Sequence, residues 1–309
     1  MAEIIVCEFM DEAIARERFA GWDLLFDPSL VDDPERLLIE VPEAKALIVR
    51  NQTQVRGILL DRAENLKVIG RLGVGLDNID LNRCRERNIA VCPAGGANDL
   101  SVAEYVLTAA MILLRSAWNS TPAMISGAWP RNEMIGQEIS GKTLGLVGYG
   151  SIARETASHA RSLGMRVIAY DPYLPPNNPL WNGAKSVDFK FLLSDADVIS
   201  IHTPLNRETH GLIDQGAIST MHSDAILINA ARGGIIVEAA LANALREGKL
   251  GGAALDVYEQ EPLTAEAGEK FSGLNNILLT PHIAGVTRES NVRISNLTAK
   301  NVLDILNVG

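Results

Sequence analysis

Three short segments of the sequence carry side chains that could bind an anion and exchange a proton. They are Arg232 in NAARGG, Glu261 in ALDVYEQEP and His282 in TPHIAG. Each follows an apolar run typical of a buried parallel strand, so all three are expected at the carboxyl edge of one sheet, where open α/β sheets bind ligands. A guanidinium, a carboxylate and an imidazole that converge there can hold an anionic ligand and transfer a proton. Taken singly, Arg232 could form an ordinary salt bridge and Glu261 could be a solvated loop acid.

A glycine pattern predicts a dinucleotide site on the same sheet. Gly148, Gly150 and Ala153 form GxGxxA directly after the apolar run 144–147 and directly before a helical stretch at 151–163. The first glycine allows a tight turn, and the second lets the backbone approach a pyrophosphate. The helix N-terminus then offers free N–H groups to the phosphates.

Asp171 ends the next apolar run, 18 residues after Ala153, where an acid can bind the ribose 2′-hydroxyl of NAD. A carboxylate at this position repels the 2′-phosphate of NADP. The following Pro172 and Tyr173 bring no cation, so we expect NAD to be preferred. The alternative interpretation is that Asp171 is only a turn residue before Pro172.

The elements that must position these residues follow an α/β pattern. The chain has 309 residues, of which 47% are hydrophobic and 21% charged, which is ordinary globular usage and the length of about two domains. Five apolar runs lie between residues 3 and 97, and six more lie in a second series that ends near residue 284. Their alternation with amphipathic stretches predicts two series of βα units around parallel sheets.

Two further helices are expected. The stretch 99–116 is nearly all apolar and has Ser101 and Glu104 at capping-box spacing, which predicts a buried helix. The stretch 287–306 predicts a last helix that is too short for a domain of its own and is expected to return to the first series. The expected domains are 1–98 together with 286–309, and 99–285 between them.

Charge and composition argue against several functions. The net charge of −10 repels phosphate backbones and anionic lipid headgroups, so neither a nucleic acid nor a membrane is expected as a partner. No apolar run approaches the roughly 20 residues that span a bilayer, and the acidic N-terminus is unlike a signal peptide, so a cytoplasmic protein is expected. Cys7, Cys84 and Cys92 are odd in number and far apart, so they are expected to be buried thiols without disulfide or metal.

With the glycine motif and the three segments around Arg232, Glu261 and His282, the sequence resembles the D-isomer-specific 2-hydroxyacid dehydrogenases. GKTLGLVGYGSIA is most similar to the phosphoglycerate dehydrogenase branch, and RLGVGLDNID and SVAE extend the resemblance over nearly the whole chain. It implies a Rossmann NAD-binding domain inserted into a discontinuous flavodoxin-like substrate domain. It also implies an NAD-dependent oxidoreductase that acts on the CH–OH group of a small 2-hydroxy acid.

The resemblance implies a role for each site residue. His282 is the proton donor, Glu261 is the carboxylate that favours its imidazolium form, and Arg232 holds the substrate carboxylate and polarises the keto oxygen. The backbone amides around Val74 and Gly75 would cradle the same carboxylate. The residues expected to contact NAD are Gly148, Gly150, Ser151, Ile152, Asp171, His202, Thr203, Pro204, Thr209, Ala230, Ala231, Arg232, Asp256, His282, Ala284 and Gly285.

The substrate is expected to carry a second anionic group, as 3-phosphoglycerate or 3-sulfolactate does. Arg50 ends the apolar run ALIV, and in the resembling phosphoglycerate dehydrogenases an arginine in the matching VR segment contacts the substrate phosphate. Arg71 is a possible second cation, and Arg131 is a weaker third that would reach from a neighbouring subunit. A homodimer is expected because the helix 99–116 and the segment around Trp118 and Trp129 carry much apolar surface.

Two departures and three alternatives remain at this stage. Val237 stands where the resembling enzymes usually carry an acid. The sequence ends at Gly309, so regulation through the C-terminal domain of many phosphoglycerate dehydrogenases is not expected. The alternatives are a glyoxylate or hydroxypyruvate reductase, an NAD(H)-sensing protein of the corepressor type, and a formate dehydrogenase. The last branch has Gln at the position of Glu261, which ranks it below the others.

Overall fold

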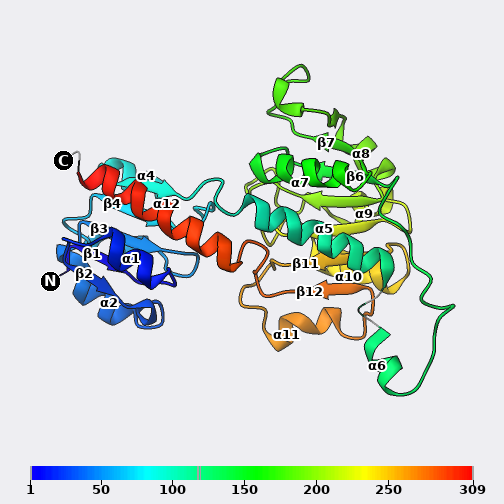
Figure 1. The fold of residues 1–309 in the computed structure, drawn as a ribbon, viewed down its shortest axis with the longest axis horizontal. Coiled ribbons are helices and arrows are strands. Elements are labelled where there is room, and N and C mark those ends of the chain that lie inside the picture. The colour runs from blue at the N-terminus through cyan, green and yellow to red at the C-terminus, as the bar shows by residue number, and fades with distance from the viewer. Residues whose placement is uncertain (1, 117, 119, 308–309) are drawn as a thin grey trace. The chain divides into compact units, whose positions relative to one another are not determined.

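The chain divides into two compact units in a computed structural model that describes residues 2–116, 118 and 120–307. Unit 1 consists of Met1–Asn98 and Val286–Gly309, and unit 2 consists of Asp99–Gly285 (Figure 1). Met1, Val308 and Gly309, which belong to the expected substrate domain, lie outside the described residues.

Unit 1 is built on a parallel sheet of five strands in the order β2-β1-β3-β4-β5. This is the flavodoxin-like order, so the fold expected for this part of the chain is confirmed. The strands are β1 Ile4–Val6, β2 Leu24–Phe26, β3 Ala46–Val49, β4 Val68–Arg71 and β5 Ala90–Pro93. The helices are α1 Glu12–Arg18, α2 Pro34–Glu40, α3 Gly57–Arg62, α4 Leu81–Glu86 and α12 Arg288–Leu306, with 3-10 turns at Pro28–Val31 and Val41–Glu43.

Helix α12 confirms the expected return of the chain to the first series. It packs on β4 and α1, and Thr287 and Ser290 form a capping box at its N-terminus. A Cβ atom at Gly70 of β4 would lie 2.7 Å from Val302 and 2.9 Å from Thr298 of α12. Glycine at this position therefore lets the helix lie close on the sheet.

Unit 2 is built on a parallel sheet of seven strands in the order β12-β11-β10-β9-β6-β7-β8. Its first six strands in chain order, β6 to β11, have the Rossmann order, and β12 adds one strand at the edge. The strands are β6 Thr143–Val147, β7 Arg166–Tyr170, β8 Lys185–Ser186, β9 Val198–Ile201, β10 Ile226–Asn229, β11 Gly252–Leu255 and β12 Ile277–Leu279. The helices are α5 Asp99–Arg115, α6 Ser120–Ile125, α7 Ser151–Ser162, α8 Phe189–Asp195, α9 Gln215–Thr220, α10 Glu238–Arg246 and α11 Ala265–Gly268, with 3-10 turns at Pro179–Trp181 and Glu269–Phe271.

Both faces of the seven-stranded sheet are covered by helices (Figure 1). In β10, Ile226 and Ile228 join an apolar cluster with α5 and α7, whereas Leu227 joins another with α8, α9 and α10. Strands that are buried on both faces give the continuous apolar runs from which the α/β class was predicted.

Helix α5 begins at Asp99 as predicted, but its N-terminal cap differs from the sequence prediction. The helix begins at Asp99, so Ser101 lies inside the first turn instead of capping it, and the predicted capping box with Glu104 is wrong. An acid at the first helical position already favours an N-terminus there, because it faces the positive end of the helix dipole. The two-residue strand β8 was also not predicted, since Lys185–Ser186 carries no apolar run.

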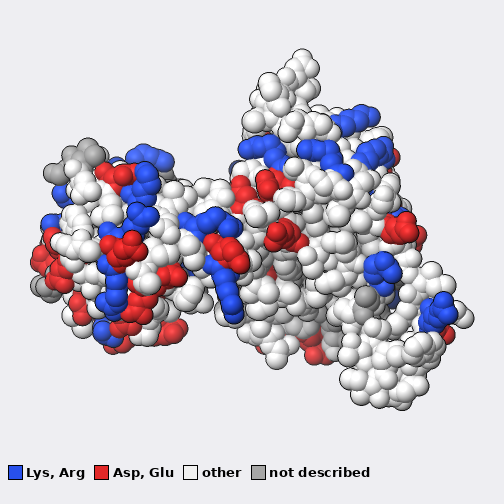
Figure 2. Space-filling view, in the orientation of Figure 1, with Lys and Arg blue, Asp and Glu red and all other residues white. Residues whose placement is uncertain are grey.

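Charged side chains of both signs are exposed on unit 1. On the face drawn in Figure 2, basic and acidic side chains lie intermixed over unit 1. No helix of the described segments has the length and apolar character needed to cross a bilayer.

All three cysteines are free; Cys7 and Cys84 are buried, whereas Cys92 is only partly buried, so its predicted burial is wrong. Cys92 lies on β5 at the edge of the sheet, where no further strand covers it.

Candidate active site

The imidazole of His282 and the carboxylate of Glu261 form the central pair of unit 2. Glu261 follows β11 and His282 follows β12, which are neighbouring strands. The Nδ1 atom of His282 lies 2.7 Å from Oε2 of Glu261, with about a third of each side chain exposed. This contact leaves Nε2 as the ring nitrogen that can exchange a proton with a ligand.

The environment keeps Glu261 ionised. Burial raises the pKa of the Glu261 carboxyl, but the hydrogen bond and charge of His282, the Tyr258 N–H and the charge of Arg232 together bring it below its usual value. A carboxylate that is stabilised in this way by an imidazolium stabilises that imidazolium in return.

Arg232 lies in the turn that follows β10, and this turn is organised by Asn229. The Asn229 side chain donates to the Arg232 carbonyl at 2.9 Å and accepts from the Ala231 N–H at 3.0 Å. The Arg232 guanidinium donates to the Ala231 carbonyl at 2.6 Å, and its positive charge helps to lower the pKa of Glu261. Unit 2 thus brings Arg232, Glu261 and His282 together at the carboxyl ends of three adjacent strands.

Asp256 holds the segment that carries His282. Its carboxylate accepts from the Thr280 hydroxyl at 2.6 Å, the Ile283 N–H at 2.8 Å and the Ala284 N–H at 2.7 Å. His282 itself has φ +56°, a left-handed conformation that is unfavourable for a side chain without local support. Asp256 supplies that support, a role that its position in the sequence did not reveal.

A residue of this network that the sequence analysis missed is Tyr105 on α5. Its hydroxyl lies 2.6 Å from the hydroxyl of Thr280, which in turn donates to Asp256. Burial raises the pKa of Tyr105 to about 12, so the phenol stays protonated. The only sequence signal was an aromatic residue in an otherwise apolar helix.

The glycine loop has the form that a dinucleotide pyrophosphate requires. Gly148 has φ +91°, and a Cβ atom there would lie 2.6 Å from the His202 carbonyl oxygen. A Cβ atom at Gly150 would meet nothing within 4 Å, and Gly150 caps α7 without any side-chain hydrogen bond. This open space beside free helix N–H groups fits a phosphate group of NAD.

Asp171 follows β7 and faces the glycine loop. One carboxylate oxygen accepts from the Tyr149 N–H at 2.9 Å, and the other accepts from the Tyr173 N–H at 2.9 Å. Each oxygen retains a lone pair for a ribose hydroxyl. Asp171 is therefore held against the loop on which the pyrophosphate would lie.

The other residues expected to contact NAD also lie after the carboxyl ends of the strands. Burial lowers the pKa of His202 to about 4, so its ring is neutral, and it lies 2.9 Å from the Ser200 hydroxyl. The Thr203 hydroxyl oxygen is buried without a hydrogen-bond partner in the described part of the chain. By position, Ser151 and Ile152 begin α7, His202, Thr203, Pro204 and Thr209 follow β9, Ala230 and Ala231 follow β10, and Ala284 and Gly285 follow β12.

In unit 1, Arg50 lies at the end of β3 on a loop anchored by Glu8. The buried Glu8 carboxylate accepts hydrogen bonds of 2.9 to 3.2 Å from the four successive N–H groups of 50–53. The Arg50 guanidinium lies over the ring of Phe9 and donates to the Asn291 side chain at 3.2 Å. Within the described residues it forms no salt bridge with an acid.

The remaining candidates of unit 1 lie just after β4. Arg71 is buried, at 8% exposure, and donates to the Leu72 carbonyl at 2.7 Å. A Cβ atom at Gly73 would lie 2.2 Å from Nη1 of Arg71, so glycine makes room for the guanidinium. Val74 is exposed and Gly75 is partly exposed.

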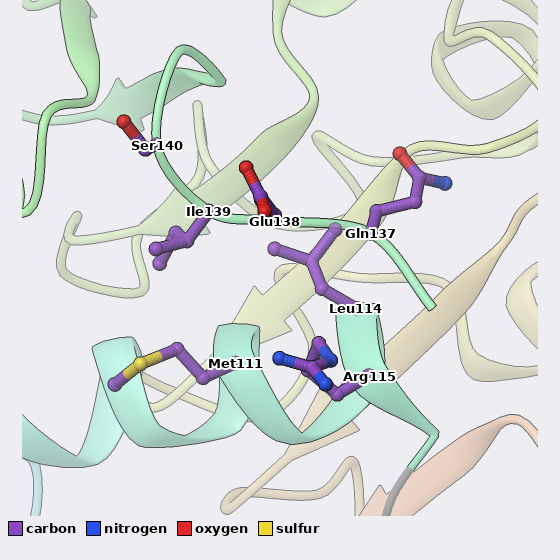
Figure 3. A pocket seen from close by; sticks show the side chains of 7 residues that line it. All are labelled: Met111, Leu114, Arg115, Gln137, Glu138, Ile139 and Ser140. Atoms are coloured by element: carbon purple, nitrogen blue, oxygen red, sulfur yellow. The ribbon is translucent and has the colours of Figure 1, made fainter. Parts of the chain in front are cut away.

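Metal sites and cavities are the remaining candidates for a functional site. No group of three or more His, Cys, Asp or Glu side chains in the described segments could hold a metal ion. An open pocket of about 270 Å³ lies between the end of α5 and residues 137–140, lined by Met111, Leu114 and Ile139 among others (Figure 3). None of the predicted site residues lines it, so it is separate from the pair of His282 and Glu261.

The chain is similar to known dehydrogenases in sequence and in fold. The family of the D-isomer specific 2-hydroxyacid dehydrogenase NAD-binding domain matches residues 107–284. An (S)-sulfolactate dehydrogenase of Chromohalobacter salexigens is 50% identical over 100% of this chain and 99% of that protein. A D-3-phosphoglycerate dehydrogenase of Archaeoglobus fulgidus is 41% identical over 88% of this chain, which spans about half of that protein, 51%.

A solved structure gives the same result. The D-lactate dehydrogenase of Aquifex aeolicus, complexed with NAD and lactic acid, has a TM-score of 0.88 and 27% identity, and the match covers 99% of this chain and 95% of that one. The fold, the glycine loop and the family match agree with one another. The chain belongs to the D-isomer specific 2-hydroxyacid dehydrogenase family and is an NAD-dependent oxidoreductase that acts on the CH–OH group of 2-hydroxy acids.

Proposed function

We propose that this enzyme interconverts a 2-hydroxy acid and the corresponding 2-keto acid. Both acids carry a second anionic group at the end opposite the carboxylate, as 3-sulfolactate and 3-phosphoglycerate do. The observation that carries the proposal is Arg50, whose guanidinium forms no salt bridge within the described residues and is held by Asn291 and Phe9 on a loop fixed by Glu8. A protein with a net charge of −10 needs such a local cation to attract a dianion. The similarity to an (S)-sulfolactate dehydrogenase supports the same substrate class.

The proposed division of labour uses three residues of unit 2. NAD, when bound, supplies the hydride acceptor or donor. His282 gives its proton to the keto oxygen during reduction and takes it back during oxidation, while Glu261 keeps the ring oriented and favours its protonated form. Arg232 binds the substrate carboxylate and stabilises negative charge on the keto oxygen. Val74 and Gly75 add backbone N–H groups, and Arg71 is a second candidate for the distal anion.

A substrate panel tests this proposal directly. NADH oxidation is measured with glyoxylate, hydroxypyruvate, 3-phosphohydroxypyruvate and 3-sulfopyruvate. We expect the highest kcat/KM with one of the two acids that carry a distal anion. Preference for glyoxylate or hydroxypyruvate would refute the second anion, and NADH binding without turnover of any acid would refute the catalytic role.

The pairing of His282 with Glu261 predicts how activity depends on pH. Reduction needs the imidazolium and declines above an alkaline limit, whereas oxidation needs the neutral ring and declines below an acid limit. Glu261→Gln removes the charge that favours imidazolium, so both limits should move to lower pH by about 1 to 2 units. The measurement is kcat/KM against pH in both directions, and unchanged limits would contradict the pairing.

Asp171 predicts a strong preference for NADH over NADPH. The 2′-phosphate of NADPH would place a second negative group beside a carboxylate already fixed by the Tyr149 and Tyr173 N–H groups. We expect kcat/KM to favour NADH by at least about 100-fold, since like charges in such a site cost several kcal/mol. Asp171→Asn should bring the kcat/KM values for NADH and NADPH closer together. A wild-type enzyme that prefers NADPH would show that Asp171 does not read the ribose.

We expect a homodimer formed through the region around α6. Figure 1 shows α6 and the adjoining chain extending away from the sheet of unit 2, and Ile125, Trp129 and Ile135 are 83%, 75% and 80% exposed. Apolar surface of this extent marks an interface. Sedimentation should therefore give twice the chain mass of 33.3 kDa at micromolar concentration, and Trp129→Glu should weaken the dimer. A wild-type monomer would rule out the interface.

Two further assignments belong to the same proposal. Residues 99–285 bind the cofactor, and residues 1–98 with 286–309 supply the contacts to the distal part of the substrate. The enzyme works in the cytoplasm, where free thiols such as Cys7, Cys84 and Cys92 stay reduced.

A further inference from the structure

Glu238 is a buried carboxylate in unit 2 that the proposed chemistry does not use. It is the first residue of α10 and is 3% exposed. Its carboxylate accepts the Glu259 N–H at 2.6 Å and lies 2.7 Å from the Lys270 ammonium. A buried charge is tolerated when it is paired and hydrogen-bonded in this way, so the contacts define a fixed geometry.

Glu259 completes the arrangement from the other side. Its carboxylate accepts the Glu238 N–H at 3.0 Å and lies 3.7 Å from Lys270. The N-cap residue of α10 is Val237, which has no side-chain acceptor for the free N–H groups of the helix. Glu259 therefore does the work of the acid that is missing at position 237.

The same segment carries the carboxylate partner of His282. Glu261 lies two residues after Glu259, and its Oε1 atom accepts the Tyr258 N–H at 3.1 Å while Oε2 contacts His282. On the opposite side, a Cβ atom at Gly233 would lie only 1.6 Å from the Tyr258 carbonyl oxygen. The backbone of 258–261 is thus held between the turn after β10 and the start of α10.

We propose that Glu238, Glu259 and Lys270 are positioning residues that fix the segment 258–261, so that the Glu261 carboxylate stays on Nδ1 of His282. The proposal rests on the proposed roles of Glu261 and His282. None of the three positioning residues has to touch the substrate or the cofactor. Their effect is transmitted through the backbone of Glu259 and Tyr258.

The sign of a pH shift separates positioning from simple electrostatics. Lys270→Met removes a positive charge, which by itself would favour the imidazolium and move the alkaline limit of reduction upward. The same substitution leaves Glu238 and Glu259 facing each other without a shared cation, which releases the segment and loosens Glu261. Loss of that carboxylate contact moves the limit downward, in the direction of Glu261→Gln.

The experiment measures kcat, KM, the alkaline limit of reduction and NADH affinity by fluorescence, using the 2-keto acid that the wild-type enzyme reduces fastest. For Lys270→Met we expect a limit lower by about 0.5 pH unit, a kcat lower on the order of 10-fold and unchanged NADH affinity. Lys270→Arg should restore the wild-type values. Lys249→Met is the matched control, because Lys249 forms an exposed ion pair with Glu247 in the same unit and should change nothing.

A second pair of variants separates helix capping from positioning. Glu259→Ala should lower both the melting temperature and the alkaline limit, whereas Glu259→Gln keeps an acceptor for the Glu238 N–H and should retain most of both. Adding Val237→Asn to Glu259→Ala supplies a neutral N-cap. It should restore the melting temperature without restoring the limit.

The failures of the two proposals are distinguishable. If Glu261→Gln lowers the limit but Lys270→Met raises it or leaves it unchanged, the positioning role is overturned and the proposed function stands. If Glu261→Gln itself has no effect, the proposed pair of Glu261 and His282 fails first. Recovery of the limit in the Val237→Asn, Glu259→Ala double variant would also overturn positioning, because capping alone would explain the effect.

Discussion

We expect the His282→Ala enzyme to reduce its 2-keto acid with a kcat about 10²- to 10⁴-fold below that of the wild type, while it binds NADH nearly as well. The loss would follow from removing the group that we propose to protonate the keto oxygen. Cofactor affinity should be retained because the glycine loop and Asp171 follow other strands, β6 and β7. Single-turnover kinetics and fluorescence titration with NADH measure the two quantities separately.

The left-handed backbone of His282 makes Asn a better control substitution than Ala. Its φ of +56° is better tolerated by Asn than by Ala, so His282→Asn should keep the conformation of the segment 280–284 while removing the proposed proton donor. It should lose as much kcat as His282→Ala. His159 on α7 lies 3.0 Å from Glu155, with 44% of its side chain exposed, so His159→Ala should keep full activity. Turnover near wild type in His282→Asn would assign the proton to another group.

The second large effect is expected for Arg50→Ala. With 3-sulfopyruvate or 3-phosphohydroxypyruvate, kcat/KM should fall about 30- to 150-fold, the equivalent of about 2 to 3 kcal/mol for a lost charge-assisted contact. With glyoxylate, which has no distal anion, it should scarcely change. Asn291 and Phe9 hold the guanidinium of Arg50 in one position, so little conformational freedom would be lost when a substrate binds.

Arg18 provides a close control for Arg50. Its guanidinium donates at 2.7 and 3.0 Å to the side chain of Asn296, also on α12, but it is fully on the surface of unit 1. Arg18→Ala removes the same charge and a similar Arg–Asn contact, so it should leave both classes of substrate unaffected. An equal loss of all substrates in Arg50→Ala would make Arg50 a structural residue.

The fold was predictable because its pattern is local. Strands such as β3 and β10 are buried on both faces and appear in the sequence as apolar runs bounded by turns. The two-residue strand β8 was missed because it has no such run and is defined only by its pairing with β7. The capping box of α5 was predicted wrongly because Ser101 and Glu104 have the required spacing, although the helix already begins two residues earlier, at Asp99.

The site was predictable only as far as strand ends determine it. Arg232, Glu261 and His282 could be placed at one edge because each follows a strand of one parallel sheet. The support of His282 by Asp256 could not be predicted, because the hydrogen bonds from Asp256 to residues 280–284 join segments more than 20 residues apart. The missing acid at position 237 was visible in the sequence. That Glu259 accepts the N–H at the start of α10 instead could not be predicted, because it depends on how α10 packs.

The discontinuity of unit 1 also dictates an order of events during synthesis. Helix α12 contributes Ile294, Ala299 and Val302 to one apolar cluster of that unit. At about 5–20 residues per second, the ribosome needs on the order of 10–40 s to pass from residue 98 to residue 286. Throughout that interval the sheet face destined for α12 is open to solvent and to other nascent chains. Residues 99–285 are contiguous, so they can fold first, and the N-terminal sheet stays dependent on a helix translated after them.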